Sequence, residues 1–333
     1  MRLLVTGGAG FIGSNFVHYW LEHHPDDRVV VYDLLTYAGN RASLAPAEDR
    51  IGFVQGDIAD RELAEATLRE ERIDVVVNFA AESHNSLAVV DPTRFFRTNV
   101  LGTQTLLEAS RAAGVERFHH VSTCEVYGDL PLDSLEIFTE ESPYRPRTPY
   151  NASKAGADHA VRAYSETYGL RVTITNCSNN YGPFQFPEKV VPLFTTNALD
   201  DLPLPMYAST QNRREWLHVL DHCSAIDLVL HEGRDGETYN VGSGIEATIE
   251  EIADLVLELT GKPGSLKTIV PDRPGHDRRY LLDSTKIRRE LGWEVVHGWR
   301  DGLAETVSWY EENRSWWEPL KERAPVEETA WRP

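Results

Sequence analysis

The chain has 333 residues, of which 41% are hydrophobic and 26% charged, and this length allows a large domain with a smaller lobe. Its formal net charge of −19 argues against nucleic acid or an anionic membrane as a partner, because both would repel such a surface. Three cysteines are too few for a disulfide framework or a zinc site, so we expect a reducing cytoplasm and no metal.

Six short apolar runs alternate with longer segments of helical period. The first run follows Met1 without a signal segment, and the sequence contains no run of about 18 apolar residues. We therefore expect a protein that is neither secreted nor membrane-spanning. The runs span residues 3–6, 29–32, 52–55, 75–79, 118–122 and 172–175. Their alternation predicts an α/β fold with a doubly wound, parallel Rossmann-type sheet.

This pattern changes near Asn176, after which five prolines interrupt the chain as far as Pro205. A helix-like stretch over 249–259 and a loop over 271–275 follow. We predict a Rossmann domain over 1–175, a return segment over about 214–240, and a smaller mixed α/β lobe over 176–333. The polar tail after Trp317 is expected to be disordered.

A glycine-rich turn follows the first predicted strand and opens a helix. It reads Thr-Gly-Gly-Ala-Gly-Phe-Ile-Gly and places glycine at positions 7, 10 and 13. Because Gly7, Gly10 and Gly13 have no side chains, the backbone can approach a pyrophosphate that is held at a helix N-terminus. The turn therefore predicts a dinucleotide site.

Acidic residues at the ends of the next two strands indicate which dinucleotide binds. Asp33 lies twenty residues after Gly13, where a carboxylate would bind a ribose diol and repel a 2′-phosphate. Asp57 and Ile58 follow the third strand, where the adenine would rest. The sequence thus favours NAD over NADP.

A tyrosine and a lysine are spaced for catalysis on one helix face. Tyr150 and Lys154 are four residues apart, so both side chains face the same way. A nearby ammonium lowers the pKa of a phenol from about 10 toward neutrality, so that a tyrosinate can take a proton from a sugar hydroxyl. Ser122 and Thr123 end an earlier strand, at the sheet edge where ligands bind.

Several longer strings resemble the dTDP-glucose 4,6-dehydratases, a branch of the extended short-chain dehydrogenases. They span residues 33–40, 80–84, 98–100, 179–183, 185–189, 214–217, 275–280 and 314–320, so the resemblance covers nearly the whole chain. It implies an NAD-dependent enzyme that acts on a nucleotide-diphosphate sugar, either a dTDP- or a UDP-hexose. It also implies a homodimer with a four-helix interface contributed by the first lobe.

The resemblance further implies a redox cycle. Tyr150 would deprotonate the C4 hydroxyl while NAD takes the C4 hydride. Glu125 would then remove the acidified C5 proton, an adjacent acid would protonate the leaving C6 hydroxyl, and the hydride would return to C6. Arg214 would pair with the diphosphate. The catalytic residues that this cycle implies are Tyr150, Lys154, Thr123, Cys124 and Glu125.

The matching positions also define two sets of expected contacts. Those expected at the cofactor are Gly7, Gly10, Phe11, Ile12, Gly13, Asp33, Leu34, Thr36, Asp57, Ile58, Ala80, Ala81, Ser83, Thr98, Tyr150, Lys154 and Asn180. Those expected at the substrate are His84, Thr123, Asn179, Lys189, Val190, Pro205, Tyr207, Arg214, Asn240, Asp277 and Tyr280.

The chain departs from the family pattern at three places. The family string Ser-Thr-Asp-Glu reads Ser-Thr-Cys-Glu here, so Cys124 replaces the expected acid. A thiol stays protonated at pH 7 but is a weak hydrogen-bond donor, and loss of general-acid assistance typically costs 10²- to 10⁴-fold in rate. Residues 85–88 replace Val-Asp-Arg-Ser, and residues 208–210 replace a glycine-rich turn.

These departures leave several functions open. Cys124 is either a substitute acid in a slower 4,6-dehydratase or a small buried residue without a chemical role. A Cys-Glu pair also occurs in nucleotide-sugar 5,6-dehydratases, which return the hydride to C4 and leave an exocyclic alkene. A 4-epimerase generally lacks the glutamate, and a UDP-glucuronate decarboxylase carries a different string around its tyrosine. A catalytically silent NAD-binding regulator is the alternative from another class.

Overall fold

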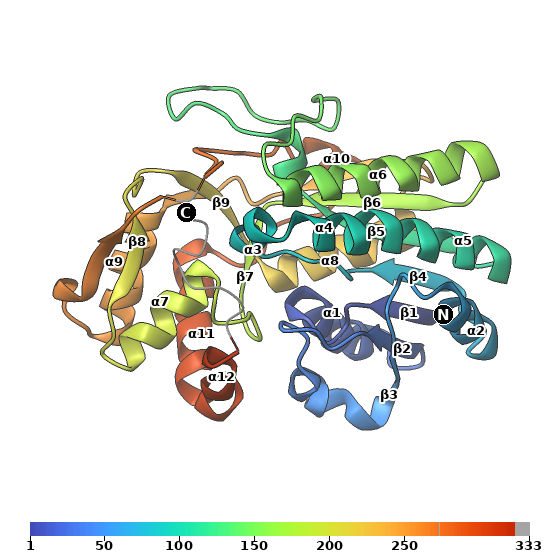
Figure 1. The fold of residues 1–333 in the computed structure, drawn as a ribbon, viewed down its shortest axis with the longest axis horizontal. Coiled ribbons are helices and arrows are strands. Elements are labelled where there is room, and N and C mark those ends of the chain that lie inside the picture. Colours follow the sequence, from blue (N-terminus) through green and yellow to red (C-terminus); the bar gives the residue numbers. More distant parts are fainter. Residues whose placement is uncertain (273, 324–333) are drawn as a thin grey trace.

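The computed structural model describes residues 1–272 and 274–323, which form a large and a small lobe side by side (Figure 1). The large lobe is built on a seven-stranded parallel sheet with the strand order β10-β6-β5-β4-β1-β2-β3. Its strands are β1 (Arg2–Thr6), β2 (Arg28–Asp33), β3 (Ile51–Gln55), β4 (Val75–Asn78), β5 (Arg117–Thr123), β6 (Val172–Cys177) and β10 (Thr238–Val241). The six predicted strands are therefore confirmed, as is the doubly wound fold.

Helices cover both faces of this sheet because its central strands are apolar on both sides. Along β1, Leu3 and Val5 pack under α1 and α8, whereas Leu4 packs with residues of α2, α5 and α6. The helices of this lobe are α1 (Phe11–His23), α2 (Arg61–Glu70), α3 (Asn85–Val90), α4 (Pro92–Phe95), α5 (Thr103–Ala113), α6 (Pro149–Tyr168) and α8 (Val219–Glu232). Three further turns are 3₁₀ or π in character: η1 (Arg41–Arg50), η2 (Phe96–Gly102) and η3 (Cys124–Tyr127).

The small lobe contains two further sheets. One has the order β11-β9-β7, and the other pairs β12 with β8. Its strands are β7 (Asn179–Tyr181), β8 (Leu204–Tyr207), β9 (Arg213–His218), β11 (Glu246–Thr248) and β12 (Lys267–Val270). The remaining helical segments are α7 (Val190–Leu199), α9 (Ile249–Thr260), η4 (Gly264–Leu266), α10 (Thr285–Leu291), α11 (Trp299–Glu312) and α12 (Arg314–Lys321). A core of its own forms between α7, α9, α11 and these strands.

The chain passes between the lobes more than once. Within the predicted return segment, β9 pairs with β7 and β11 in the small lobe, so the return begins only at α8 and ends with β10 on β6. Helix α12 continues past Trp317, and Leu320 is buried, so the start of the predicted disordered tail is helical. The rest of that tail, 324–333, lies outside the described residues. Within the described ranges, no helix combines the length and apolar character needed to cross a membrane.

Candidate active site

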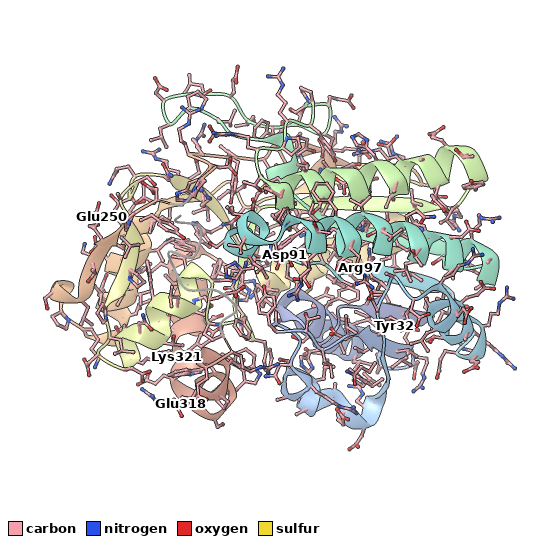
Figure 2. All side chains as sticks on the ribbon, in the orientation of Figure 1. Tyr32, Asp91, Arg97, Glu250, Glu318 and Lys321 are labelled. Carbon is pink, nitrogen blue, oxygen red and sulfur yellow. The ribbon has the colours of Figure 1, made fainter. Side chains whose placement is uncertain are left out.

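A cavity of about 650 Å³ lies where the carboxyl ends of the large sheet meet the small lobe. Both lobes contribute to its wall, and this volume is typical of small-molecule sites. Figure 2 shows Tyr32, near the end of β2, and Lys321, at the end of α12; both residues line the cavity. Ligands of doubly wound sheets bind at this edge, outside the carboxyl ends of the strands.

The glycine turn forms part of the cavity wall at the N-terminus of α1. A Cβ on Gly7, which has φ +65°, would lie 2.7 Å from the nitrogen of Ala80, and one on Gly13 would lie 2.3 Å from the carbonyl oxygen of Gly7. The turn therefore has no room for side chains. Among the residues described, no side chain caps α1. Its first N–H groups and the positive end of its dipole fit an anion such as a pyrophosphate.

Asp33 lines the same cavity at the end of β2. Its two carboxylate oxygens accept the backbone N–H groups of Ala9, at 2.9 Å, and Leu35, at 2.7 Å. Burial raises the pKa of Asp33, while these two hydrogen bonds act in the opposite direction. Asp57 pairs with Arg97 at 2.8 Å beside the cavity wall. The carboxylate of Asp33 is thus held where a ribose diol could bind it.

Tyr150 and Lys154 stand one turn apart on α6, and both line the cavity. Burial raises the pKa of Tyr150 well above its usual value, and repulsion from Glu125 adds to this effect. That Lys154 lowers this pKa stays a prediction. The Nζ atom of Lys154 donates to the carbonyl of Val121 at 2.8 Å and lies 3.3 Å from Nε2 of His120, and burial lowers the pKa of the lysine itself.

Glu125 reaches the cavity from the turn that follows β5. Its backbone N–H donates to Oγ1 of Thr123 at 3.3 Å, which starts the η3 turn. The side-chain amide of Asn85 donates to Oε2 of Glu125 at 3.3 Å, and Asn85 in turn accepts from the hydroxyl of Thr148. Glu125, Thr123 and Tyr150 all line the cavity, so a candidate base lies in the same space as the candidate oxidation residues.

Cys124 takes the place of a small buried residue, the second of its two predicted roles, and not that of a substitute acid in the cavity. Its side chain is fully buried in an apolar cluster that includes Val126, Tyr127 and Tyr280, and it does not line the cavity. The physical reason is the η3 turn, which begins at Cys124 and ends the strand geometry of β5. Burial raises the pKa of the thiol well above its ordinary value, so the group is neutral.

Arg214 brings a cation to the small-lobe wall of the cavity. The side chain is buried on β9, and its guanidinium donates to the backbone carbonyls of Arg213, Asp277 and Arg278. It also lies 4.8 Å from the ring centre of Tyr280. Within the described part of the chain, no carboxylate lies at ion-pair distance from Arg214. A buried cation compensated only by dipoles fits an anionic ligand such as a diphosphate.

Asn240 lies away from the cavity, contrary to the predicted substrate contact. It stands on β10 opposite Asn176 of β6, and it is completely buried. Its Oδ1 accepts from the hydroxyl of Tyr127 at 2.8 Å, and its Nδ2 donates to the carbonyl of Phe138. Those bonds occupy the side chain inside the fold. All other predicted site residues except Cys124 line the cavity.

A buried carboxylate that the sequence did not single out bridges the lobes. The hydroxyl of Tyr37 donates to Oε1 of Glu188 at 3.0 Å, and Nε2 of His84 lies 3.3 Å from Oε2. Lys189 is 3.6 Å from the same carboxylate. Burial raises the pKa of Glu188, and Lys189 opposes that shift. Each of these residues lies in a string that matches the family, but their contact joins positions 151 residues apart, which no local spacing reveals.

The doubly wound sheet, the glycine turn and the Tyr150–Lys154 pair in one cavity define an extended short-chain dehydrogenase. Residues 4–306 match the family model described as GDP-mannose 4,6 dehydratase, and the chain belongs to that family. A dTDP-glucose 4,6-dehydratase from Streptomyces niveus is 50% identical over 327 residues, with 96% of each chain covered.

Solved structures extend this similarity to the fold. The dTDP-glucose 4,6-dehydratase DesIV from Streptomyces venezuelae, crystallised with NAD, is 54% identical with a TM-score of 0.93, covering 96% of this chain and all of the other. A UDP-glucose 4-epimerase from Thermotoga maritima with UDP-glucose is 31% identical with a TM-score of 0.88, covering 94% of this chain and all of the other. The fold is therefore shared by dehydratases and epimerases, and the side chains in the cavity must distinguish them.

Proposed function

We propose that this chain is an NAD-dependent dTDP-glucose 4,6-dehydratase. The observation that carries the proposal is that Glu125 lines the same cavity as Tyr150 and Lys154. Oxidation alone needs only the tyrosine and the lysine, whereas elimination of water also needs a base for the C5 proton. The full-length similarity to dTDP-glucose 4,6-dehydratases supports the same reaction.

NAD would be held by the glycine turn at its pyrophosphate and by Asp33 at its adenosine ribose. The absence of space for a Cβ at Gly7 and Gly13 supports this fit. When bound, NAD⁺ supplies a hydride acceptor and a positive charge that opposes the repulsion between a tyrosinate and Glu125. The substrate would extend toward the small lobe, with Arg214 at its diphosphate.

Tyr150 would take the proton of the C4 hydroxyl as that carbon is oxidised. The resulting ketone acidifies the C5 proton, which Glu125 would remove. Because Cys124 does not line the cavity, we propose that Glu125 serves both proton transfers. It would give the proton taken from C5 to the departing C6 hydroxyl, so that one water leaves. Return of the hydride to C6 and transfer of a solvent proton to C5 would complete a 4-keto-6-deoxy sugar, and the C4 proton taken by Tyr150 would pass to solvent.

The products formed from three nucleotide sugars, each incubated separately, test this proposal. The purified chain is incubated with dTDP-glucose, UDP-glucose and UDP-N-acetylglucosamine, and products are identified by mass and proton NMR. We expect loss of water with a new methyl doublet. Loss of water with vinylic protons would identify a 5,6-dehydratase, and inversion at C4 without mass change an epimerase. Absence of both turnover and bound NAD would favour a regulator.

The role of Glu125 is tested separately by exchange at C5 in deuterated water. We expect Glu125→Gln to retain C4 oxidation but to lose incorporation of deuterium at C5, because an amide cannot accept that proton. Continued exchange at the wild-type rate would assign the base to another residue, such as Glu188, whose side chain is 6% exposed and which lines the same cavity.

We also propose a homodimer in a reducing compartment such as the cytoplasm. Val90 on α3 and Phe96 and Leu101 on η2 are between 44% and 52% exposed, and both elements pack against α6. This apolar surface supports a contact with a second copy. The three cysteines are free and buried, as expected without oxidative pairing. Light scattering after size-exclusion chromatography tests the dimer, and Leu101→Lys should favour the monomer.

A further inference from the structure

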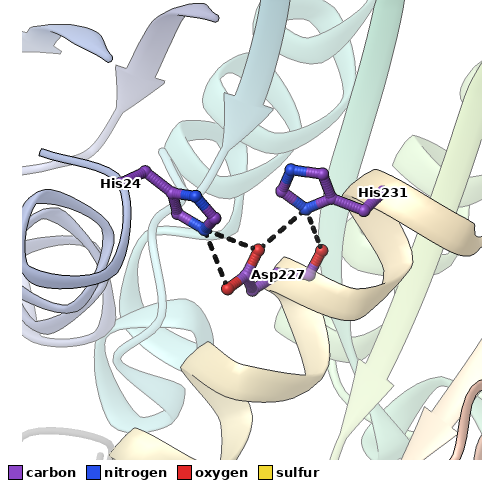
Figure 3. A group of neighbouring side chains, drawn as sticks. All are labelled: His24, Asp227 and His231. Atoms are coloured by element: carbon purple, nitrogen blue, oxygen red, sulfur yellow. Dashed lines mark hydrogen bonds and ion pairs between the residues drawn. The ribbon is translucent and has the colours of Figure 1, made fainter. Parts of the chain in front are cut away.

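A second group of ligand-forming side chains lies outside the cavity, where the C-terminal parts of α1 and α8 meet. His24 follows the last residue of α1, while Asp227 and His231 stand one turn apart on α8 (Figure 3). The two helices are 203 residues apart at this point but pack on the same apolar core. None of the three residues lines the cavity.

The three side chains direct one ligand atom each toward a common point. Nε2 of His24 is 3.0 Å from both carboxylate oxygens of Asp227. Nδ1 of His231 is 2.9 Å from Oδ1 and 3.0 Å from the backbone carbonyl oxygen of Asp227, so an ion would have to displace that second contact as well. All three ligand atoms lie within 4.8 Å of one another. Around a tetrahedral ion with bonds of about 2.0 to 2.1 Å, ligand atoms are roughly 3.3 Å apart. A cation could therefore replace the bridging protons after small side-chain movements.

We propose that His24, Asp227 and His231 bind a divalent transition-metal ion, and that Zn²⁺ is the ion best matched. Two imidazoles and one carboxylate are a ligand set that suits zinc, whereas Mg²⁺ requires six oxygen ligands. A water molecule would complete four-coordination on the exposed side, where His231 is 37% accessible.

The surroundings hold these ligands in place. The ring of Trp20 lies 4.2 Å from that of His24 and 5.6 Å from that of His231, centre to centre. The negative charge of Asp227 lies near the hydroxyl of Tyr19 and, after burial, raises the pKa of the tyrosine to about 12. Such outer contacts orient metal ligands and strengthen their binding.

The local charge also favours a cation. Among the described residues, the ion-pair partners of Asp227 are the two histidines only. These are charged only when protonated, so the carboxylate lacks a permanent counter-ion. Each helix also presents the negative end of its dipole here. Without metal, the same groups could join the helices by hydrogen bonds alone, and binding measurements separate the two cases.

A bound ion would act on stability, because it would clamp α1 to α8 away from the chemistry. Helix α1 begins at the glycine turn, and its thirteen residues span about 20 Å, so the clamp would lie far from that turn. We therefore expect Zn²⁺ to raise the unfolding midpoint without changing turnover. This expectation holds whether or not the chain is a dehydratase.

The test uses the full chain without an affinity tag, freed of metal by a chelator. Titration calorimetry with ZnCl₂ should give one site per chain, and MgCl₂ should give none. His24→Ala and His231→Ala should each weaken Zn²⁺ binding by more than about tenfold. His23→Ala is the matched control, because His23 is adjacent in sequence but bonds the carbonyl of Tyr19 instead. Its Zn²⁺ affinity should equal that of the wild type.

A second measurement does not depend on how the variants fold. Co²⁺ added to the wild-type chain should produce the visible absorption of a four-coordinate site, and Zn²⁺ should displace it. Failure of the wild type to bind Zn²⁺ at one equivalent would overturn the proposal. So would unchanged binding in folded His24→Ala and His231→Ala, or an effect of His23→Ala equal to theirs.

Discussion

The side-chain amide of Asn85 donates to Oε2 of Glu125 across 3.3 Å and joins the segment after β4 to the turn after β5. The oxygen of the same amide accepts from the hydroxyl of Thr148, which caps the helix that carries Tyr150. One side chain therefore connects the proposed base for C5 with the helix of the oxidation residue. In the family pattern this position is valine, which could make neither bond.

Replacing Asn85 with alanine should slow C5 proton exchange about tenfold or more. A hydrogen bond to a charged group contributes about 1.5 to 3 kcal/mol, and its loss would release Glu125 from its position. C4 oxidation, followed by the absorbance of NADH, should change little. Asn313→Ala is the control, since that side chain bonds the carbonyl of Trp309 and neither residue lines the cavity. Equal losses in oxidation and exchange would instead indicate general damage to the site.

Tyr150→Phe should reduce product formation by at least about 10² to 10⁴, because the variant lacks the group that takes the C4 proton. Tyr164→Phe offers a matched control on the same helix. Its hydroxyl contacts Gln104 and Glu108 rather than the cavity, so its turnover should stay near that of the wild type. Near-normal turnover in Tyr150→Phe would contradict the assigned base.

Cys124→Ala should leave turnover within a few-fold of the wild type, because the thiol does not line the cavity. The substitution should instead lower the free energy of unfolding by about 1 kcal/mol, because a fully buried side chain loses packing contacts. Steady-state rates and thermal unfolding measure the two effects. A rate loss of more than tenfold would show that the thiol does act as the acid. A faster Cys124→Asp variant would show that an acid at this position can reach the leaving group.

Stability should also depend on the protonation of Glu215. This buried carboxyl accepts the N–H groups of Gly244 and Leu282, and burial raises its pKa from 4.5 to about 7. A raised pKa means that the native state binds the proton more tightly than the unfolded chain. Protonated Glu215 therefore contributes about 3 kcal/mol to the free energy of unfolding. This contribution is complete below pH 4.5 and is lost as the pH rises through about 7.

Unfolding midpoints measured from pH 5 to pH 8 test this dependence. The wild type should lose stability with rising pH relative to Glu215→Gln, whose side chain does not titrate. Glu22→Gln, at an exposed position on α1, should follow the wild-type curve. Parallel curves for the wild type and Glu215→Gln would contradict the prediction.

The elements that the sequence predicted well are those set by local pattern. Each central strand is a continuous apolar run, and the glycine turn and the Tyr150–Lys154 spacing are fixed by neighbours along the chain. The places of Cys124 and Asn240 depend on a turn and on long-range contacts that local pattern does not fix. Cys124 turns inward because η3 begins there, and Asn240 is held by Tyr127, which is 113 positions away. The Tyr37–Glu188 contact likewise arises only when the two lobes meet.

The late return of the chain to the large sheet has a consequence for how the protein can be made. A fragment ending near residue 175 would retain Gly7, Tyr150 and Lys154, but it would lack α8 and β10. Ile226 and Leu230 of α8 would no longer cover one face of the sheet, and β6 would become an open edge. Such a fragment should aggregate rather than bind a nucleotide. During synthesis, the large sheet can be completed only after β10, which ends at Val241, has emerged from the ribosome. Part of the small lobe is therefore made before the large lobe is complete.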